Sequence, residues 1–298
     1  MAKTSDLLSR VAEIRANAKS RPVAEEQKEL CKVFQLPLWP EEARGVPNAA
    51  LRSALFGAIK KGARAYLERK EIHAQEGIRI IYTGARLDQG DLDVWETVLH
   101  MARMQALGNE CRITAYQLLK ALGKTDTGIN RATLDRRLSR MKATGVDVKV
   151  GKFSYEGSLI DEVYRAEETK EYVIRLNPKL SSLFAVDQFT QVDWSVRHAL
   201  DGKPLAQWLH GYYASHAKPY PVTVSMLLKV CGSENEAPGS GKQKLKKALD
   251  ALTEAGNANG QTFSYSIEQD IVEVSRKPST SQRRHLAKKA AKQKKLKF

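Results

Sequence analysis

Two segments of the chain repeat the same pattern of apolar and polar positions. One covers residues 113–123 and the other covers residues 222–232. In each, a threonine (Thr114 or Thr223) precedes a short apolar run that ends in Leu-Leu-Lys-x-x-Gly. Threonine is a favourable helix N-cap, and glycine suits the left-handed position after a helix end. Each segment therefore predicts a short helix with equivalent boundaries.

A second helical pattern follows each short helix after a polar turn that contains glycine. Its apolar stripe is formed by Leu134, Leu138 and Met141 in the first copy and by Leu245, Leu249 and Leu252 in the second. This spacing places the apolar side chains of each copy on one face of a helix. Residues 239–241, Gly-Ser-Gly, predict the turn that leads into the second copy's helix.

Alternating strand patterns follow each helix pair. After the first pair, residues 146–150 alternate and a return strand is expected around residues 172–176; after the second pair, the strands are expected at 262–267 and 271–274. Longer amphipathic helices precede the two copies, at residues 92–107 and around 204–216. Helix, turn, helix and β-hairpin is the order of a winged-helix domain. The fold class predicted is α+β, with two tandem winged-helix domains and flexible N- and C-terminal tails.

The net charge of the chain indicates a class of binding partner. The 298 residues carry a formal net charge of +15, from 49 Lys and Arg against 34 Asp and Glu. Such a balance favours a polyanion, either nucleic acid or an anionic membrane surface. No apolar run approaches the roughly 18 residues of a membrane span, so we expect no membrane insertion.

The basic residues concentrate at the C-terminus. Ten of them lie between Arg276 and Phe298, where no acidic residue occurs. Because the stretch is also poor in apolar residues, we expect a tail that is disordered or transiently helical when free. It is suited to neutralising phosphates; the alternative is a tail that only keeps the protein soluble.

The outward faces of the two second helices carry the candidate DNA contacts. With the apolar stripes inward, the outward and flanking residues are Thr133, Arg136, Arg137 and Arg140 in the first copy and Lys242, Gln243, Lys244 and Lys247 in the second. Arg pairs with guanine and Gln with adenine in the major groove, whereas Lys more often contacts phosphate. Lys149 and Lys152, in the expected first hairpin, are candidates for backbone contacts.

No pattern for catalysis accompanies these residues. The histidines show neither an HxH nor an HExxH spacing, so no metal site is expected. The run Gly-Ser-Gly-Lys at residues 239–242 is not a P-loop, because Glu236 stands where a glycine is required and Gln243 follows the lysine. Three scattered cysteines fit a reducing compartment. The sequence predicts a cytoplasmic DNA-binding protein that is not an enzyme and has no catalytic residues and no cofactor.

A short motif lies ahead of the first domain, in Gln35-Leu36-Pro37-Leu38-Trp39-Pro40. Its prolines exclude a regular helix, so we expect an extended, exposed segment. Large apolar side chains exposed in a loop favour a partner. A glutamine followed by spaced leucines and an aromatic resembles the bacterial sliding-clamp-binding motif, with Gln35, Leu36, Leu38 and Trp39 as the contacting residues. The alternative is that the segment packs on its own domain.

The domain organisation predicted from these patterns has four parts. Residues 1–46 form a flexible N-terminal segment that contains the clamp-binding-like motif at 35–39. Residues 47–186 form the first winged-helix domain and residues 187–276 the second. Residues 277–298 form the basic disordered tail.

Several stretches together resemble the TrfA-type plasmid replication initiators. They are residues 52–56, residues 81–84, residues 183–185 with Asp187, Thr190 and Trp194, residues 215–221, and residues 231–233. The resemblance extends from Phe34 to Val274 and rests on the order and spacing of these stretches. This chain has Trp39 where the family motif usually has Phe, and Pro37 replaces a small polar residue. The basic tail is not part of the family pattern.

The resemblance implies an initiator of plasmid replication. Such proteins bind directly repeated origin sequences (iterons), open the adjacent A·T-rich DNA, and recruit the host replicative helicase and sliding clamp. It implies double-stranded origin DNA and single-stranded A·T-rich DNA as ligands, and a monomer–dimer equilibrium. The alternative function is a winged-helix transcriptional repressor, including one that regulates its own gene, which would bind the same DNA without opening it.

Overall fold

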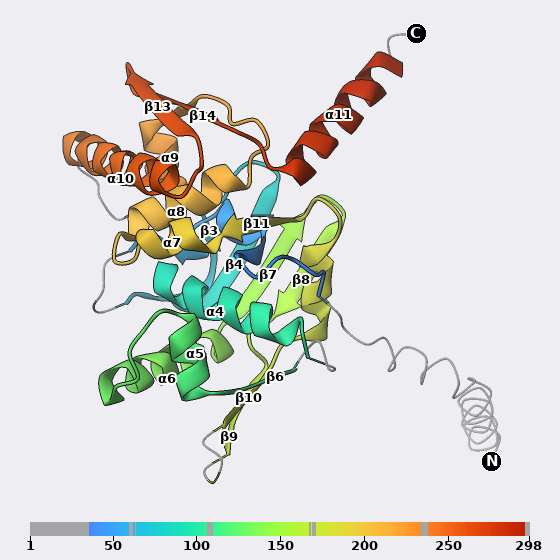
Figure 1. Cartoon of the computed structure of the whole chain (residues 1–298), viewed down its shortest axis with the longest axis vertical. Helices are drawn as coiled ribbons and strands as arrows, with labels where there is room; N and C mark the ends of the chain where they lie inside the picture. The colour runs from blue at the N-terminus through green and yellow to red at the C-terminus, as the bar shows by residue number, and fades with distance from the viewer. Residues whose placement is uncertain are drawn as a thin grey trace, which may run out of the picture. The chain divides into compact units, whose positions relative to one another are not determined.

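The elements expected from the repeat are present in two units, and in the first unit two further strands lie between the helix pair and the hairpin (Figure 1). The computed structural model describes residues 36–295, apart from 60–61, 63, 106–109, 167, 169–170 and 234–237. The first unit contains β6 (Glu110–Thr114), α5 (Ala115–Ala121), α6 (Gly128–Lys142), β9 (Glu162–Ala166) and β10 (Glu171–Arg175). The second contains β12 (Val222–Thr223), α9 (Val224–Val230), α10 (Pro238–Ala258), β13 (Phe263–Glu268) and β14 (Ile271–Arg276).

The sheets of the two units have the same strand order. The first is β6-β10-β9 and the second is β12-β14-β13, and both are antiparallel. In each, the strand before the helix pair hydrogen-bonds to the last strand of the hairpin. The α+β class predicted from the sequence is confirmed, and a helix precedes each unit as expected: α4 (Gln89–Ala102) and α8 (Pro204–Ala214).

The strand pairing predicted for the hairpin of the first unit is wrong. Strand β7 (Gly145–Val150) does not pair with residues 172–176. It lies between β4 (Ile78–Ala85) and β8 (Phe153–Gly157) in the sheet β3-β4-β7-β8, in which β3 is Tyr66–Ile72. The buried faces explain the choice, since Val146 and Val148 lie opposite Tyr82 and Ile80 of β4. Alternation predicts which face of a strand is buried but not which strand lies beside it.

Helix α4 is the centre of the first core. It begins with a reciprocal capping box in which Asp88 accepts from the Asp91 N–H and Asp91 accepts from the Asp88 N–H. Trp95, on its buried face, stacks on Phe56 at a centroid separation of 5.6 Å. Phe56 belongs to β2 (Phe56–Gly57), which pairs in parallel with β5 (Leu87–Asp88). The capping box therefore fixes the start of α4 beside this short ladder.

The second core lies between α8, α9 and α10. Its fully buried side chains include Trp208 and Tyr212 of α8, whose rings stack at 4.9 Å, and Leu227 of α9. The stripe predicted for α10, Leu245, Leu249 and Leu252, is buried against them. The aromatic residues of α8 thus serve the core.

A shared ladder joins the two halves of the chain. Strand β1 (Ala43–Pro47) pairs antiparallel with β11 (Phe189–Asp193), in the register Ala43 to Asp193 and Pro47 to Phe189. The short helix α3 (Asn48–Leu51) follows β1, the 3₁₀ helix η1 (Pro178–Phe184) precedes β11, and α7 (Trp194–Ala199) follows it. Residues 43–46, predicted to be flexible, are therefore part of a sheet with the start of the second half. Residues 1–35 lie outside the described residues.

The C-terminal tail, expected to be disordered or transiently helical, contains a helix. Helix α11 covers Thr280–Lys295. Its start is capped reciprocally, because Gln282 N–H donates to Ser279 Oγ (3.3 Å) and Ser279 N–H donates to Gln282 Oε1 (3.0 Å). The Ala and Lys residues that follow have high helix propensity. The low apolar content of the tail excludes a core but not a capped helix.

Candidate nucleic-acid interface

Equivalent threonines start the short helix of each unit. Thr114 Oγ1 accepts from the Gln117 N–H (3.2 Å), and Gln117 Oε1 accepts from the Thr114 N–H (3.0 Å). Thr223 Oγ1 accepts from the Met226 N–H (3.2 Å) in the second unit. The N-caps predicted from the repeat are therefore confirmed. Thr127 caps α6 in the same way, accepting from the Asn130 N–H (3.3 Å).

The outward face of α6 carries Arg136. Its guanidinium is exposed and donates from Nη2 to Thr133 Oγ1 (3.1 Å), so the two predicted residues act together. Ile129, which lies on the same face near the start of α6, is 79% exposed. An exposed apolar side chain beside an arginine is suited to contact a thymine methyl group. The sequence pattern missed Ile129, although its position two turns before Arg136 places it on the outward face.

Arg140 faces the first core, contrary to the prediction that it points outward. Its Nη1 lies 2.5 Å from Oδ1 of Asp91, a carboxylate with no exposed side-chain surface. Arg137 also turns toward the start of α4, because a Cβ built on Gly90 would lie 1.8 Å from Arg137 Nη1. Burial raises the pKa of Asp88, but the charges of Arg137 and Arg64 outweigh it and hold the pKa below its usual value. These two arginines therefore position α6 against α4.

The second unit keeps most of its predicted cations exposed. Gln243, Lys244 and Lys247 are exposed on α10. Lys242 is also exposed and forms an ion pair with Asp270 in the turn of the β13–β14 hairpin, at 3.0 Å. Lys244 and Lys247 line a groove of about 780 Å³ between α10 and the start of α8. The first turns of α10 thus present cations, and Asp250 and Glu254 line the same groove further along the helix.

Residues 239–241 do not form the connecting turn that was predicted between the two helices. They form the first turn of α10, which begins at Pro238. Proline at the first position of a helix has no hydrogen bond to lose, which explains the early start. A Cβ on Gly241 would lie 2.6 Å from Leu228 Cδ1, so glycine allows α9 and α10 to approach closely here.

Lys149 and Lys152 lie away from the hairpin in which they were expected. Lys149 is on β7 and Lys152 is in the turn before β8, so both belong to the sheet β3-β4-β7-β8. They are exposed, but β9 and β10 form the hairpin of the first unit. The mistaken pairing of β7 is the reason for this error.

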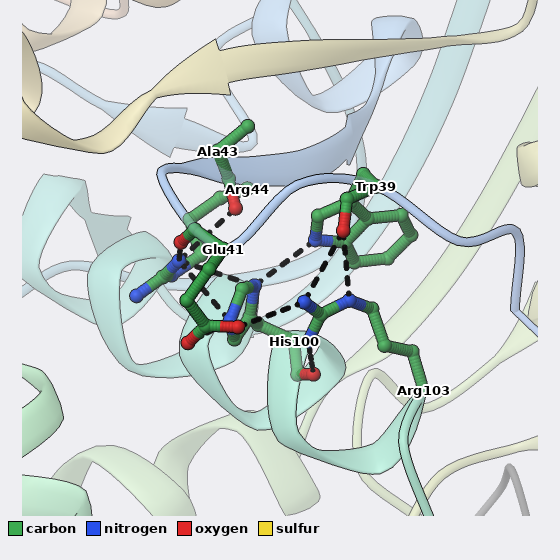
Figure 2. Close-up of polar contacts among 6 residues, drawn as sticks. All are labelled: Trp39, Glu41, Ala43, Arg44, His100 and Arg103. Atoms are coloured by element: carbon green, nitrogen blue, oxygen red, sulfur yellow. Dashed lines mark hydrogen bonds and ion pairs between the residues drawn. The ribbon is translucent and has the colours of Figure 1, made fainter.

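The clamp-binding-like motif is largely buried, contrary to expectation. Leu36 is 2% exposed and Trp39 is 5% exposed, whereas Leu38 is 68% exposed. Gln35 lies outside the described residues. Figure 2 shows Trp39 held by residues of α4 and the turn after it. The alternative, that the segment packs on its own domain, describes Leu36 and Trp39 correctly.

His100 organises the contacts around Trp39 (Figure 2). Trp39 Nε1–H donates to His100 Nδ1 (3.0 Å), and Arg44 Nη1 also lies 3.1 Å from this atom. Because Nδ1 accepts, the proton of the neutral ring is on Nε2, which donates to Glu41 Oε1 (2.9 Å). Burial lowers the pKa of His100, and the hydrogen bond to His100 helps to lower the pKa of Glu41.

Arg103 contacts both the backbone and the ring of Trp39. Its Nη2 donates to the Trp39 carbonyl (3.2 Å) and to Glu41 Oε2 (3.1 Å), and its guanidinium lies 5.5 Å from the Trp39 ring centroid. Phe184 of η1 stacks on the indole at 6.2 Å. Trp39 therefore satisfies its N–H and packs its ring at once, which explains why it is buried.

Residues of the stretches that carry the family resemblance contact the other half of the chain where the two halves join. Arg52 Nε donates to Ser215 Oγ (2.8 Å), and Trp208 Nε1 donates to the Ser53 carbonyl (3.0 Å). Arg86 Nη2 donates to the Gly232 carbonyl (2.6 Å). These stretches hold the two units in a defined relation.

Neither metal ligands nor a membrane span emerge from the described part of the chain. Within the described residues, no group of three or more His, Cys, Asp or Glu side chains is placed to hold a metal ion. Among the same residues, no helix is long and apolar enough to cross a bilayer.

Comparison with known proteins gives the family. The sequence profile of the TrfA protein family matches residues 2–276. The chain belongs to the TrfA family. It is 28% identical over 260 residues to the plasmid replication initiator protein TrfA of Escherichia coli, covering 84% of this chain and 68% of that protein.

Solved structures resemble the fold over most of its length. Two crystal structures of domains 2 and 3 of RctB match with TM-scores of 0.53 and 0.52. Each is 13% identical and covers 78% of this chain and 98% of the solved chain. This similarity concerns the fold alone.

Proposed function

We propose that this chain is a plasmid replication initiator that binds iterons at the origin, and that its two repeat units are winged-helix domains. Its membership of the TrfA family, over residues 2–276, carries this proposal. The E. coli relative is a plasmid replication initiator. The presence of an outward, cationic second helix in both units supports DNA as the ligand.

Helices α6 and α10 are the proposed recognition helices. In the first unit, Ile129, Thr133 and Arg136 face the major groove, while Arg137 and Arg140 hold α6 in place. In the second, Gln243 reads a base, and Lys244 and Lys247 neutralise phosphates. Lys242 is tied to the hairpin turn through Asp270 and contributes to the positive surface there.

The later steps of initiation belong to the same proposal. The protein opens the A·T-rich DNA next to its sites and recruits the host replicative helicase and sliding clamp, acting in the cytoplasm, without an enzymatic activity of its own, in a monomer–dimer equilibrium. Clamp binding through residues 35–39 requires Leu36 and Trp39 to leave their buried positions, since only Leu38 of the described motif residues is largely exposed.

The deciding experiment is permanganate footprinting of the parent plasmid's origin on supercoiled DNA, with and without the protein. An initiator protects repeated sites and makes thymines reactive in an adjacent A·T-rich stretch. Protection without reactive thymines, in the presence of host DNA-bending proteins as well as in their absence, favours the repressor. Failure to protect any repeat would reject the proposal altogether.

A further inference from the structure

Helix α11 concentrates positive charge beyond the family match. The match ends at residue 276, whereas α11 covers Thr280–Lys295. From residue 277 to the C-terminus the sequence contains nine Lys and Arg residues and no Asp or Glu. The helix therefore lies outside the residues that match the family, and nothing in the proposed winged-helix interface uses it.

Residues at the N-terminal end of α11 form hydrogen bonds and an ion pair with the rest of the fold. Gln282 Nε2 donates to the Ala214 carbonyl (2.7 Å), and Arg276 Nη1 donates to the carbonyls of Tyr213 and His216 (both 3.0 Å). His285 Nδ1 lies 3.1 Å from Asp187 Oδ2. These contacts fix where the helix starts and which way its first turns run, which a merely solubilising tail does not need.

The charge is arranged along the helix. Arg283, Arg284, Lys288 and Lys289 are exposed, whereas Gln282 and Leu286 are half-buried. Arg284 and Lys288 are four residues apart on one face, and the sequence continues this spacing at Lys292. Like charges at this spacing destabilise a helix. A row of phosphates would remove that repulsion, so a polyanion is the ligand that suits this helix.

The helix lies apart from the proposed recognition surface of the second unit. Strand β14 separates them: its Ile271 end adjoins the hairpin turn that pairs with Lys242, and its Arg276 end leads into α11. A six-residue strand spans about 20 Å. Phosphates bound by α11 are therefore not those bound at the hairpin turn.

We propose that α11 is a sequence-independent binding site for the DNA phosphate backbone, separate from the iteron contact. Taking DNA as the polyanion rests on the proposed function. Two sources present this chemistry: duplex DNA beyond the iteron, and the single strand exposed when the origin opens.

The test compares the full chain with R284Q/K288Q/K292Q/K295Q, in which glutamine preserves helix propensity. Binding to a duplex with one iteron and long flanks is measured across a range of KCl concentrations. Each lost phosphate contact lowers the slope of log affinity against log salt by about 0.9, so we expect a slope shallower by about 2–4. The control R284K/K288R/K292R/K295R keeps the charge and should retain the parent slope. Equal slopes for the Gln variant and the parent on this duplex, together with equal affinity of the two proteins for oligo(dT), would overturn the proposal.

Two further arms identify the source of the phosphates. If the flank is the ligand, the difference between parent and Gln variant disappears on a duplex that ends at the iteron edge. If the single strand is the ligand, oligo(dT) binds the parent more tightly than the Gln variant. A duplex of scrambled sequence separates this test from the proposed function. If the parent binds the scrambled duplex as tightly as the iteron duplex, iteron recognition is rejected. The difference in slope between the parent and the Gln variant on the scrambled duplex still tests phosphate binding by α11.

Discussion

Nε of Arg197 lies 2.7 Å from Oδ1 of Asp93 and 2.6 Å from Oε1 of Glu96. Arg197 belongs to α7, and both carboxylates belong to α4. The arginine is 1% exposed, and its Nη2 also donates to the carbonyl of Gln89 (3.1 Å). This cluster therefore links the helix that precedes the first unit to the beginning of the second half, and it helps to set the spacing of the two proposed recognition helices.

Replacing Arg197 should destabilise the protein strongly. R197M removes the partner of Glu96, which has no exposed surface, and loss of one member of a buried ion pair costs about 3–5 kcal/mol. Urea unfolding at pH 7 measures this loss. The double variant R197M/E96Q removes the arginine and the fully buried carboxylate, leaves only the partly exposed Asp93 without this partner, and should recover a large part of the stability. A loss below about 1 kcal/mol for R197M would contradict the role given to this cluster.

Two arginines on α6 should separate DNA binding from stability. R136Q removes an exposed side chain, so we expect unchanged thermal unfolding and weaker iteron binding, by about 1–3 kcal/mol if Arg136 reads a guanine. R140Q removes one of the two arginines that pair with buried Asp91 (Arg64 is the other), so it should lower the free energy of unfolding by about 1.5–3 kcal/mol while the folded protein binds DNA normally. Gel shifts and urea unfolding of both variants provide the measurements.

The two variants serve as controls for each other, because each removes one positive charge from the same helix. If R140Q weakened iteron binding as much as R136Q at a temperature where both are folded, the assignment of Arg140 to the α4 contact would be wrong.

The local elements of both units could be predicted from the sequence because their signals are local. Thr114 and Thr223 lie within three residues of the N–H groups that they cap. The stripe of Leu134, Leu138 and Met141 repeats at helical spacing, and all three residues are buried. The outward face of α6 follows from that stripe, which is why Arg136 was placed correctly.

The errors concern partners that are distant in the sequence. Arg140 lies one turn beyond Arg136 on the helix, rotated by about 40°, and its direction is decided by Asp91, which is 49 residues earlier. Lys149 was misplaced because the alternation of β7 does not show that β4 lies beside it. Trp39 was expected to be exposed because its neighbours are prolines, whereas its burial depends on His100 and Arg103. Local patterns therefore predict elements and faces, but not tertiary contacts.

The motif at residues 35–39 should contribute to stability through Trp39 but not through Leu38. W39A removes a buried indole and its hydrogen bond to His100, so we expect a loss of about 3–5 kcal/mol. L38A changes a side chain that is 68% exposed and should leave unfolding within about 0.5 kcal/mol of the parent.

This difference determines how clamp binding must be tested. L38A leaves the fold intact, so its loss of a pull-down with the host clamp would support the proposed contact. W39A is unsuitable alone, because it also weakens the domain. Retention of the pull-down by L38A, together with parent-like unfolding, would argue against Leu38 as a clamp contact.

Acid should destabilise the protein through two buried histidines. Burial lowers the pKa of His210 to about 3 and that of His216 to about 4, against 6.5 in the unfolded chain. Below pH 6.5 the unfolded state binds protons that the folded state does not, so stability is fully present above pH 6.5 and falls as the pH decreases. At pH 5 each histidine should cost about 2 kcal/mol relative to neutral pH.

The contribution of His210 can be isolated by substitution. H210N has a neutral side chain at every pH in this range, so the fall in unfolding free energy between pH 7.5 and pH 5 should be smaller than in the parent by about 2 kcal/mol. Urea unfolding of both proteins at the two pH values measures the difference, and the carboxylates, which titrate alike in both, cancel. Parallel pH dependence in the parent and H210N would show that His210 does not resist protonation in the folded state.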